Sequence, residues 1–153
     1  MLGILLALVA ASILAGCSPA PGPRDSGGRV TASAPADTFS LRTGDCTGAI
    51  TSGAVSRVTL IPCDSEHPWE VVATTELAGT DFPGAGKVQD DAEAFCNEAF
   101  KAFIGVSVAK SEYDVTMLQP TKETWTSAHD RTVTCLAGRE GGSFTGTLKG
   151  AGK

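Results

Sequence analysis

The sequence predicts an α+β domain in which a small antiparallel sheet packs against one main amphipathic helix and is cross-linked by two disulfides. Three observations support this fold class. Short apolar segments alternate with turn-rich stretches, one segment repeats its apolar residues at helical spacing, and the segment expected to fold contains four cysteines. The length of 153 residues leaves room for one folded domain, and we find no internal repeat.

Five segments have the composition and flanking residues of β-strands. They are 57–62, 69–77, 112–119, 131–137 and 144–149. In 69–77 apolar and polar residues alternate, so one face is expected to be buried and the other exposed to solvent. The expected buried set is Trp69, Val71, Ala73 and Leu77, and the expected outward set is Glu70, Thr74 and Glu76.

A helix is predicted over residues 88–104, where apolar side chains recur at helical spacing and form one stripe. Gly105 follows directly and can adopt the left-handed conformation that commonly ends a helix. The stripe is expected to pack on the sheet. It consists of Val88, Ala92, Phe95, Cys96, Ala99, Phe100 and Phe103.

The overall composition excludes some classes of partner. Hydrophobic residues make up 42% of the chain, but six Phe, two Trp and one Tyr are a small supply of large core side chains, which favours covalent cross-links. The formal net charge is −5, and Lys and Arg form no cluster that would bind phosphates. We therefore expect no nucleic-acid partner and no electrostatic attraction to anionic lipids.

The N-terminal segment resembles the signal peptide of an exported lipoprotein. Residues 2–15 are almost entirely apolar, yet the run is shorter than the roughly 20 residues of a transmembrane helix. A buried core helix is the alternative, but the Ser, Pro and Gly that follow argue against it. We expect residues 1–16 to be removed and a lipidated cysteine to hold the protein at the outer face of the cytoplasmic membrane. The lipobox is Leu14-Ala15-Gly16, followed by Cys17 as the acceptor of the lipid.

Residues 17–38 are expected to form a lipidated, flexible tether. Ser, Ala, Pro and Gly dominate this stretch, and Val30 is its only large aliphatic residue. Such a composition does not offset the entropy lost on ordering. The folded domain is therefore expected over residues 39–153.

The domain contains Cys46, Cys63, Cys96 and Cys135. An even number of cysteines in an oxidising compartment predicts two disulfides, for which three pairings are possible. We favour Cys46–Cys63, which closes a short loop around the first strand, and Cys96–Cys135, which joins the helix to a strand. The alternative is a metal site on the same thiols, but the cysteine spacing differs from known zinc patterns.

Five segments follow one another in a characteristic order. They are Thr43-Gly44-Asp45-Cys46, then Ile61 to His67 leading into Glu70-Val71-Val72, then Cys96 in a Phe-rich helix, then Trp125 before Asp130 to Cys135, and finally Gly146 to Gly150. Together they resemble the septum formation domain over residues 41–150. That family occurs in exported and membrane-anchored proteins of high-GC Gram-positive bacteria, and its name implies a link to cell division. His129 is a departure, because the family usually has glycine there.

The sequence contains no catalytic constellation that we recognise. It has no G-x-S-x-G motif and no phosphate-binding loop, and its domain cysteines are expected to be paired. Catalytic zinc needs about three protein ligands, whereas the only histidines are His67 and His129. We therefore expect a protein that is not an enzyme and binds no metal or cofactor, and a zinc-dependent hydrolase is the least favoured alternative.

The candidate binding residues are His67, Trp69, Glu70, Trp125 and Arg131. His67 and Glu70 lie at a turn before a strand, so they are expected to fix that turn by hydrogen bonds to the backbone or to Arg131. Trp69 and Trp125 are expected in the core, although they could instead line a shallow pocket. The favoured function is an envelope lipoprotein that presents a non-catalytic surface to an envelope or division protein. The alternative is a lipoprotein that binds a ligand in such a pocket.

Overall fold

A computed structural model describes residues 22–51 and 55–153 of the chain. The expected signal segment and the lipobox Leu14-Ala15-Gly16 lie outside the described residues, as does Cys17, so their processing stays a prediction. No helix within the two described ranges combines the length and the apolar character needed to cross a membrane.

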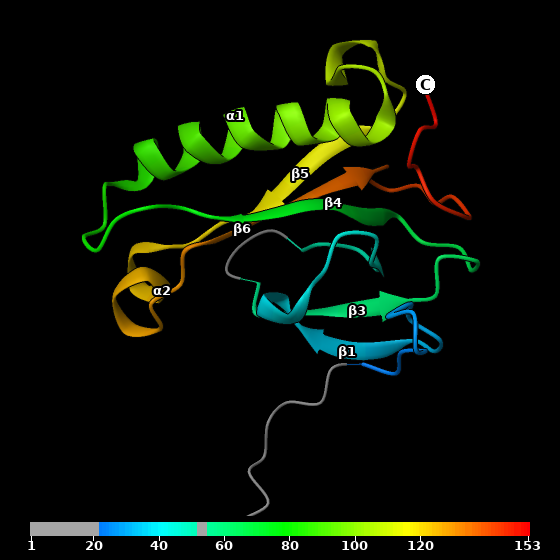
Figure 1. The fold of residues 1–153 in the computed structure, drawn as a ribbon, viewed down its shortest axis with the longest axis horizontal. Coiled ribbons are helices and arrows are strands. Elements are labelled where there is room, and N and C mark those ends of the chain that lie inside the picture. The colour runs from blue at the N-terminus through cyan, green and yellow to red at the C-terminus, as the bar shows by residue number, and fades with distance from the viewer. Residues whose placement is uncertain (1–21, 52–54) are drawn as a thin grey trace, which may run out of the picture.

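Six strands form one curled antiparallel sheet with the order β1-β3-β2-β4-β6-β5 (Figure 1). The strands are β1 (Ala34–Asp37), β2 (Cys46–Thr47), β3 (Arg57–Ile61), β4 (Trp69–Glu76), β5 (Asp114–Leu118) and β6 (Thr132–Gly138). Four of the predicted strands are confirmed as β3 to β6. The predicted strand over 144–149 is wrong, because in that segment only Phe144 makes a β-bridge, with His67.

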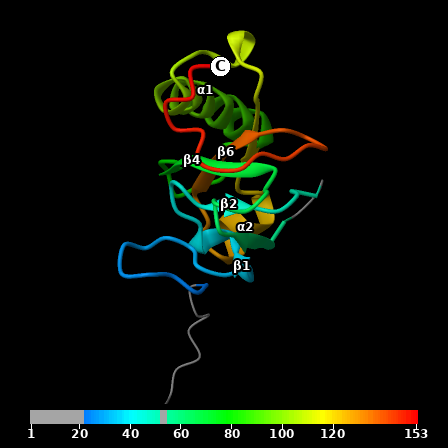
Figure 2. The same ribbon diagram turned by 90° about the vertical axis from the view of Figure 1, so that its right-hand side faces the viewer.

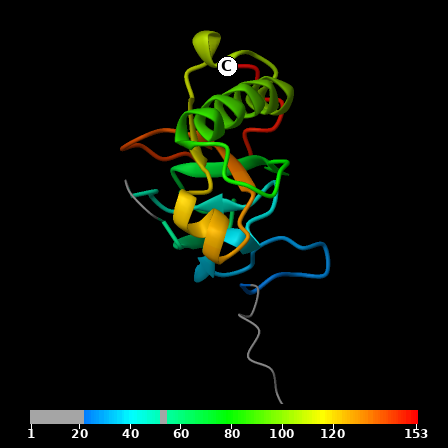
Figure 3. The ribbon, with the colours of Figure 1, turned by 90° about the vertical axis from the view of Figure 1, so that its left-hand side faces the viewer.

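The helix α1 (Ala85–Ile104) lies across one face of the sheet and contacts β4, β5 and β6 (Figure 1). It confirms the predicted helix, and Gly105 ends it with a φ of 102°. The shorter α2 (Lys122–Ser127) connects β5 to β6 and lies beside the sheet, away from α1 (Figure 3). Two 3-10 turns, η1 (Thr38–Ser40) and η2 (Val108–Lys110), complete the elements of the described residues.

The sheet is covered on both faces. Between α1 and the sheet lies a cluster of Val72, Ala92, Cys96, Phe100, Ile104, Tyr113, Val133, Cys135, Ala137 and Leu148. A second cluster consists of Ala36, Leu41, Val58, Leu60, Trp69, Val71 and Leu136. Cys135 and Leu136 are neighbours on β6 and belong to different clusters, as expected when successive side chains point to opposite faces of a strand. In Figure 2 α1 lies at the top, the central strands lie below it, and β1, an edge strand of the same sheet, lies at the bottom.

Both favoured disulfides are confirmed. Cys46–Cys63 joins β2 to the turn after β3, and Cys96–Cys135 joins α1 to β6. The Cα–Cα distance is 5.3 Å in each, within the usual range for a disulfide. The second disulfide lies inside the cluster under α1, so it fixes the helix on the sheet.

The simple alternation predicted for β4 is wrong at its centre. The pairing of β4 with β6 shifts register between Val71 and Ala73. Val71 therefore lies opposite Leu136 of the second cluster, whereas Ala73, expected on the same face as Val71, lies opposite Cys135 of the cluster under α1. Glu70, expected on the solvent side, is 1% exposed, because the second cluster and the C-terminal segment cover both sides of this part of the sheet.

The flexible tether predicted for residues 17–38 is wrong over its described part, because residues 22–38 are folded. β1 pairs with β3 from Ala34 opposite Leu60 to Asp37 opposite Arg57. Further upstream, the Arg24 guanidinium donates two hydrogen bonds to the Asp45 carboxylate, and both side chains are under a tenth exposed. Strand pairing and this ion pair offset the entropy that the segment loses on ordering. The composition of the segment gave no sign of either interaction. The folded domain therefore includes residues before 39.

Candidate functional site

The structure separates the five predicted binding residues into different environments. His67 and Glu70 lie beside the C-terminal segment, and Trp125 and Arg131 lie together beside α2. Trp69 is 6% exposed in the second core cluster. The five residues therefore form no common site.

His67 and Glu70 hold the segment 144–148, which we call the C-terminal strap. The backbone of His67 exchanges two hydrogen bonds of 3.0 Å with Phe144, and the imidazole ring packs against the Phe144 ring at a centroid distance of 4.3 Å. The Glu70 carboxylate accepts hydrogen bonds of 2.6 Å from the Thr147 hydroxyl and the Leu148 N–H. The interpretation that these residues fix local structure through the backbone is confirmed, whereas the suggested contact with Arg131 is wrong.

Both side chains of this pair are buried, and this affects their chemistry. Burial raises the pKa of the Glu70 carboxyl, and the hydrogen bonds from Leu148 and Thr147 offset part of this rise. Nδ1 of His67 lies 2.8 Å from the Ser65 carbonyl oxygen, which can only accept, so Nδ1 donates this hydrogen bond. Nε2 is buried and has no hydrogen-bond partner among the described residues.

Trp125 and Arg131 form a structural unit at the base of α2. The Arg131 guanidinium carbon lies 3.7 Å from the centroid of the Trp125 ring, in a cation–π arrangement. Arg131 donates to the carbonyls of Gly79 and Thr80, and the Trp125 indole N–H also donates to Thr80 at 3.0 Å. Trp125 is 1% exposed. The preferred assignment of both tryptophans to the core is confirmed, so they do not line a shallow pocket.

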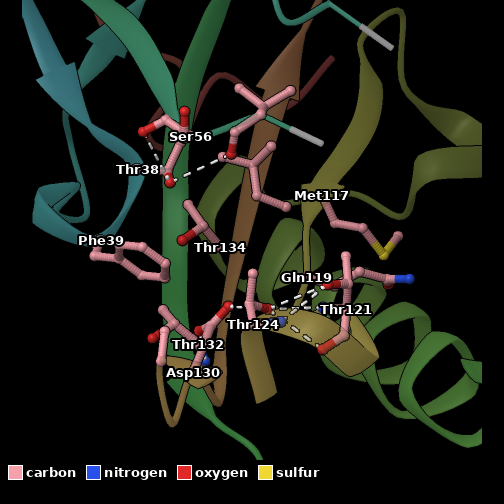
Figure 4. Close-up of a pocket in the computed structure, with 13 residues that line it drawn as sticks. Thr38, Phe39, Ser56, Met117, Gln119, Thr121, Thr124, Asp130, Thr132 and Thr134 are labelled. Atoms are coloured by element: carbon pink, nitrogen blue, oxygen red, sulfur yellow. Dashed lines mark hydrogen bonds between the residues drawn. The ribbon is translucent and has the colours of Figure 1, made fainter. Parts of the chain in front are cut away.

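The structure contains a groove that the sequence analysis missed. Its volume is about 540 Å³, and it lies between η1, the sheet and α2 (Figure 4). Its residues are Thr38, Phe39, Val55, Ser56, Met117, Leu118, Gln119, Thr121, Thr124, Ala128, Asp130, Thr132 and Thr134. None of the five predicted binding residues is among them. Arg131 lines only a smaller hollow beside it, which also includes Phe39 and His129.

The groove presents apolar side chains, hydroxyl groups, the Gln119 amide and one carboxylate, that of Asp130. Phe39 and Met117 lie on opposite sides of it (Figure 4), and Phe39 is 53% exposed. Several polar groups already have partners: the Thr124 hydroxyl donates to Asp130 at 3.0 Å, and Asp130 also accepts from the Thr132 N–H. The groove residues include no histidine, cysteine or lysine. The groove is therefore suited to hold an apolar or uncharged group.

Topology, rather than a local motif, assembles the groove. Phe39 comes from η1, at the boundary between the predicted tether and the predicted domain, and Met117 comes from β5. One signal was present in the sequence: Thr132 and Thr134 alternate with the buried Val133 and Cys135, so the side of β6 that they occupy could have been assigned.

One cluster in the described ranges has the composition of a metal site. Ligand atoms of Cys46, Cys63 and His67 lie within 4.8 Å of one another. The two cysteines are joined in a disulfide, so their sulfurs are not free thiolates. His129 does not belong to this cluster, and the alternative of a zinc-dependent hydrolase built on both histidines therefore gains no support.

The comparison with protein families matches residues 22–135 to the family described as Septum formation. The chain belongs to this family. The match extends from Gly22, in the folded segment before β1, to Cys135 in β6, and it includes all four cysteines of the two disulfides. It confirms the resemblance found in the sequence. Neither a curated protein nor a solved structure matches the chain.

Proposed function

We propose that this member of the septum formation family is a lipid-anchored envelope protein whose domain binds a partner during septum formation and catalyses no reaction. The observation that carries the proposal is the family match, which includes most of the folded chain. The apolar run over residues 2–15 and the lipobox that ends at Cys17 support the location at the outer face of the cytoplasmic membrane.

The groove supports a binding role for the domain. Phe39 is a large apolar side chain that is more than half exposed, and it lies at the rim of a groove whose far side includes Met117. Aromatic and methionine side chains are enriched in the buried centres of protein interfaces. We therefore place the partner of the domain at this groove.

Localisation of the full chain tests this function. A fluorescent protein fused after Lys153 is suitable, because the C-terminal segment bonds to the end of α1, away from α2 (Figure 1). We expect membrane labelling that concentrates at midcell in dividing cells. Uniform labelling of the envelope would contradict the septal role. Retention of Cys17→Ala in the membrane with its leader removed would contradict the lipid anchor.

A variant of the groove tests whether midcell enrichment depends on binding at the groove. Phe39→Ser should leave the fold intact, because Phe39 is largely exposed, and should reduce midcell enrichment several-fold. Lys101→Ser, an exposed change on α1, is the matched control and should label midcell like the unchanged protein. Equal enrichment in both variants would argue against the groove as the binding surface.

A second candidate function is the binding of a small molecule in the same groove. The volume of about 540 Å³ favours it, because it lies within the range of ligand pockets. Ala128→Trp would fill part of the groove. A small molecule that native mass spectrometry detects on the protein extracted from membranes, and that is absent from Ala128→Trp, would support this function over partner binding.

A further inference from the structure

The Cys46–Cys63 disulfide lies beside the buried His67. A ring nitrogen of His67 and the two sulfurs lie within 4.8 Å of one another. The His67 side chain and Cys46 are wholly buried. Three side chains of this composition are a common ligand set for zinc, once the sulfurs are thiolates.

Hydrogen bonding fixes the tautomer of His67. Nδ1 donates to the Ser65 carbonyl at 2.8 Å, which leaves a lone pair on Nε2. Nε2 is buried without a hydrogen-bond partner in the described part of the chain. Histidines that bind metals usually donate one ring N–H to a carbonyl or carboxylate and use the other nitrogen as the ligand. The arrangement around His67 already has the first of these two interactions.

The two disulfides differ in their access to solvent. Cys96 and Cys135 are both 0% exposed under α1, whereas Cys63 is partly exposed at the turn after β3. An exposed disulfide reacts more readily with an external thiolate than a buried one. The turn after Cys63 also contains the exposed Asp64 and Glu66.

We propose that reduction of the Cys46–Cys63 disulfide creates a zinc site in which the Cys46 and Cys63 thiolates and Nε2 of His67 bind the ion. A dithiol reductant supplies two electrons and two protons, breaks the S–S bond and is itself oxidised to a disulfide. Zn²⁺ then displaces both thiol protons and forms two Zn–S bonds and one Zn–N bond. Zn–S bonds of about 2.3 Å require the two sulfurs to move to roughly 3.8 Å apart, which side-chain rotation can supply. This proposal is independent of the proposed partner at the groove.

Co²⁺ serves as the spectroscopic probe for this site. The full chain in detergent is treated with limiting phosphine, and peptide mapping after alkylation identifies the free thiols. We expect free Cys46 and Cys63 with Cys96–Cys135 intact, and binding of one Co²⁺ with thiolate charge-transfer absorption and the visible bands of a near-tetrahedral ion. One equivalent of Zn²⁺ should abolish these bands. The oxidised protein should show none of them.

His67→Gln tests the third ligand, and His129→Gln is the matched control at the other histidine. We expect at least tenfold weaker Co²⁺ binding in reduced His67→Gln and unchanged binding in His129→Gln. If His67→Gln does not fold, Cys63→Ser replaces it, and its Co²⁺ affinity should fall at least as far. Any of three results would overturn the proposal: unfolding on reduction, no Co²⁺ bound by the reduced chain, or equal affinity in the variants that lack a ligand.

Discussion

The two halves of the sheet are stabilised in different ways. In the helix-covered half, α1 buries a continuous apolar stripe on β4, β5 and β6, and Cys96–Cys135 lies inside that core. The N-terminal half, from Gly22 to Cys63, has short strands, a buried ion pair and a disulfide with one partly exposed cysteine. The first half depends on the apolar stripe buried under α1, whereas the second adds specific polar partners to the apolar residues that it contributes to the second cluster. The groove lies where the two halves meet.

The largest effect is expected from a cavity in the helix-covered half. Phe100 is 0% exposed between α1 and the sheet, so Phe100→Ala should lower the free energy of unfolding by about 4 kcal/mol. Urea denaturation of the oxidised protein measures this. Lys101→Ala, the exposed neighbour on the same helix, should change it by less than about 0.5 kcal/mol. A loss below about 1 kcal/mol for Phe100→Ala would show that burial under α1 is not the main source of stability there.

For the N-terminal half, the corresponding prediction is a loss of stability when the Arg24–Asp45 ion pair is broken. Arg24→Met leaves the buried Asp45 carboxylate without its partner and should cost about 3 kcal/mol. Adding Asp45→Asn removes the uncompensated charge and should recover part of that loss. Arg29→Met is the control, because Arg29 pairs with Asp25 but is 85% exposed, and it should cost less than about 1 kcal/mol. Equal losses in the two arginine variants would break the comparison between the halves.

The sequence predicted the helix-covered half well because burial there leaves a periodic pattern. The stripe over 88–104 and the strand over 131–137 could be identified without knowledge of their partners. In the N-terminal half, β3 is the only strand that its sequence pattern predicted. β1 is Ala-Pro-Ala-Asp, and its backbone pairs with β3, while Arg24 and Asp45 are 21 residues apart in the chain. Neither the pairing of β1 with β3 nor the ion pair of Arg24 with Asp45 produces a hydrophobic pattern in the local sequence.

The same limit explains the candidate site. His67 and Glu70 were expected to have structural roles at a turn, but the strap that they hold was predicted to be a strand. Phe39 and Met117 face each other across the groove only because of the strand order of the sheet. Residues that meet through topology cannot be paired from composition or spacing in one sequence.

Variants of Glu70 test how much the C-terminal strap contributes to stability. The strap runs from Phe144, which pairs with His67 in the turn after β3, to Leu148 in the cluster under α1. Glu70→Ala removes the acceptor of the Leu148 N–H and the Thr147 hydroxyl and should cost about 2 kcal/mol. Glu70→Gln should cost less, because the amide oxygen can accept from Leu148 and the amide N–H can donate to Thr147. Chemical denaturation measures both losses, and equal losses would show that the Gln amide does not replace the carboxylate as the partner of Leu148 and Thr147.

The pH dependence of the free energy of unfolding, compared between the unchanged protein and Glu70→Gln, tests the pKa shift of the Glu70 carboxyl. The pKa of Glu70 in the folded protein is raised above its ordinary value of 4.5 by burial, so between these two values the folded state binds more protons than the unfolded state. The free energy of unfolding should therefore fall as the pH rises through that window, and this contribution is absent above it. Glu70→Gln should lack this component. An opposite slope relative to Glu70→Gln would contradict the direction of the pKa shift.

The smallest predicted effect concerns His129, in the turn between α2 and β6 at the edge of the groove. Its φ is 53°, a left-handed conformation in which a side chain costs energy and glycine does not. His129→Gly should raise the free energy of unfolding by about 0.5 to 1 kcal/mol, since the relief of strain exceeds the greater entropy of glycine in the unfolded chain. His129→Ala, which keeps a Cβ, should bring no such gain.

Localisation of the His129→Gly variant tests whether the strained His129 is needed for partner binding. His129→Gly leaves Phe39 and the groove residues unchanged, and His129 itself lines only the adjoining hollow. A more stable protein with normal midcell enrichment would show that the strained histidine is not needed for binding. A more stable protein that no longer concentrates at midcell would extend the binding surface from the groove into the hollow, with the imidazole as a contact of the partner.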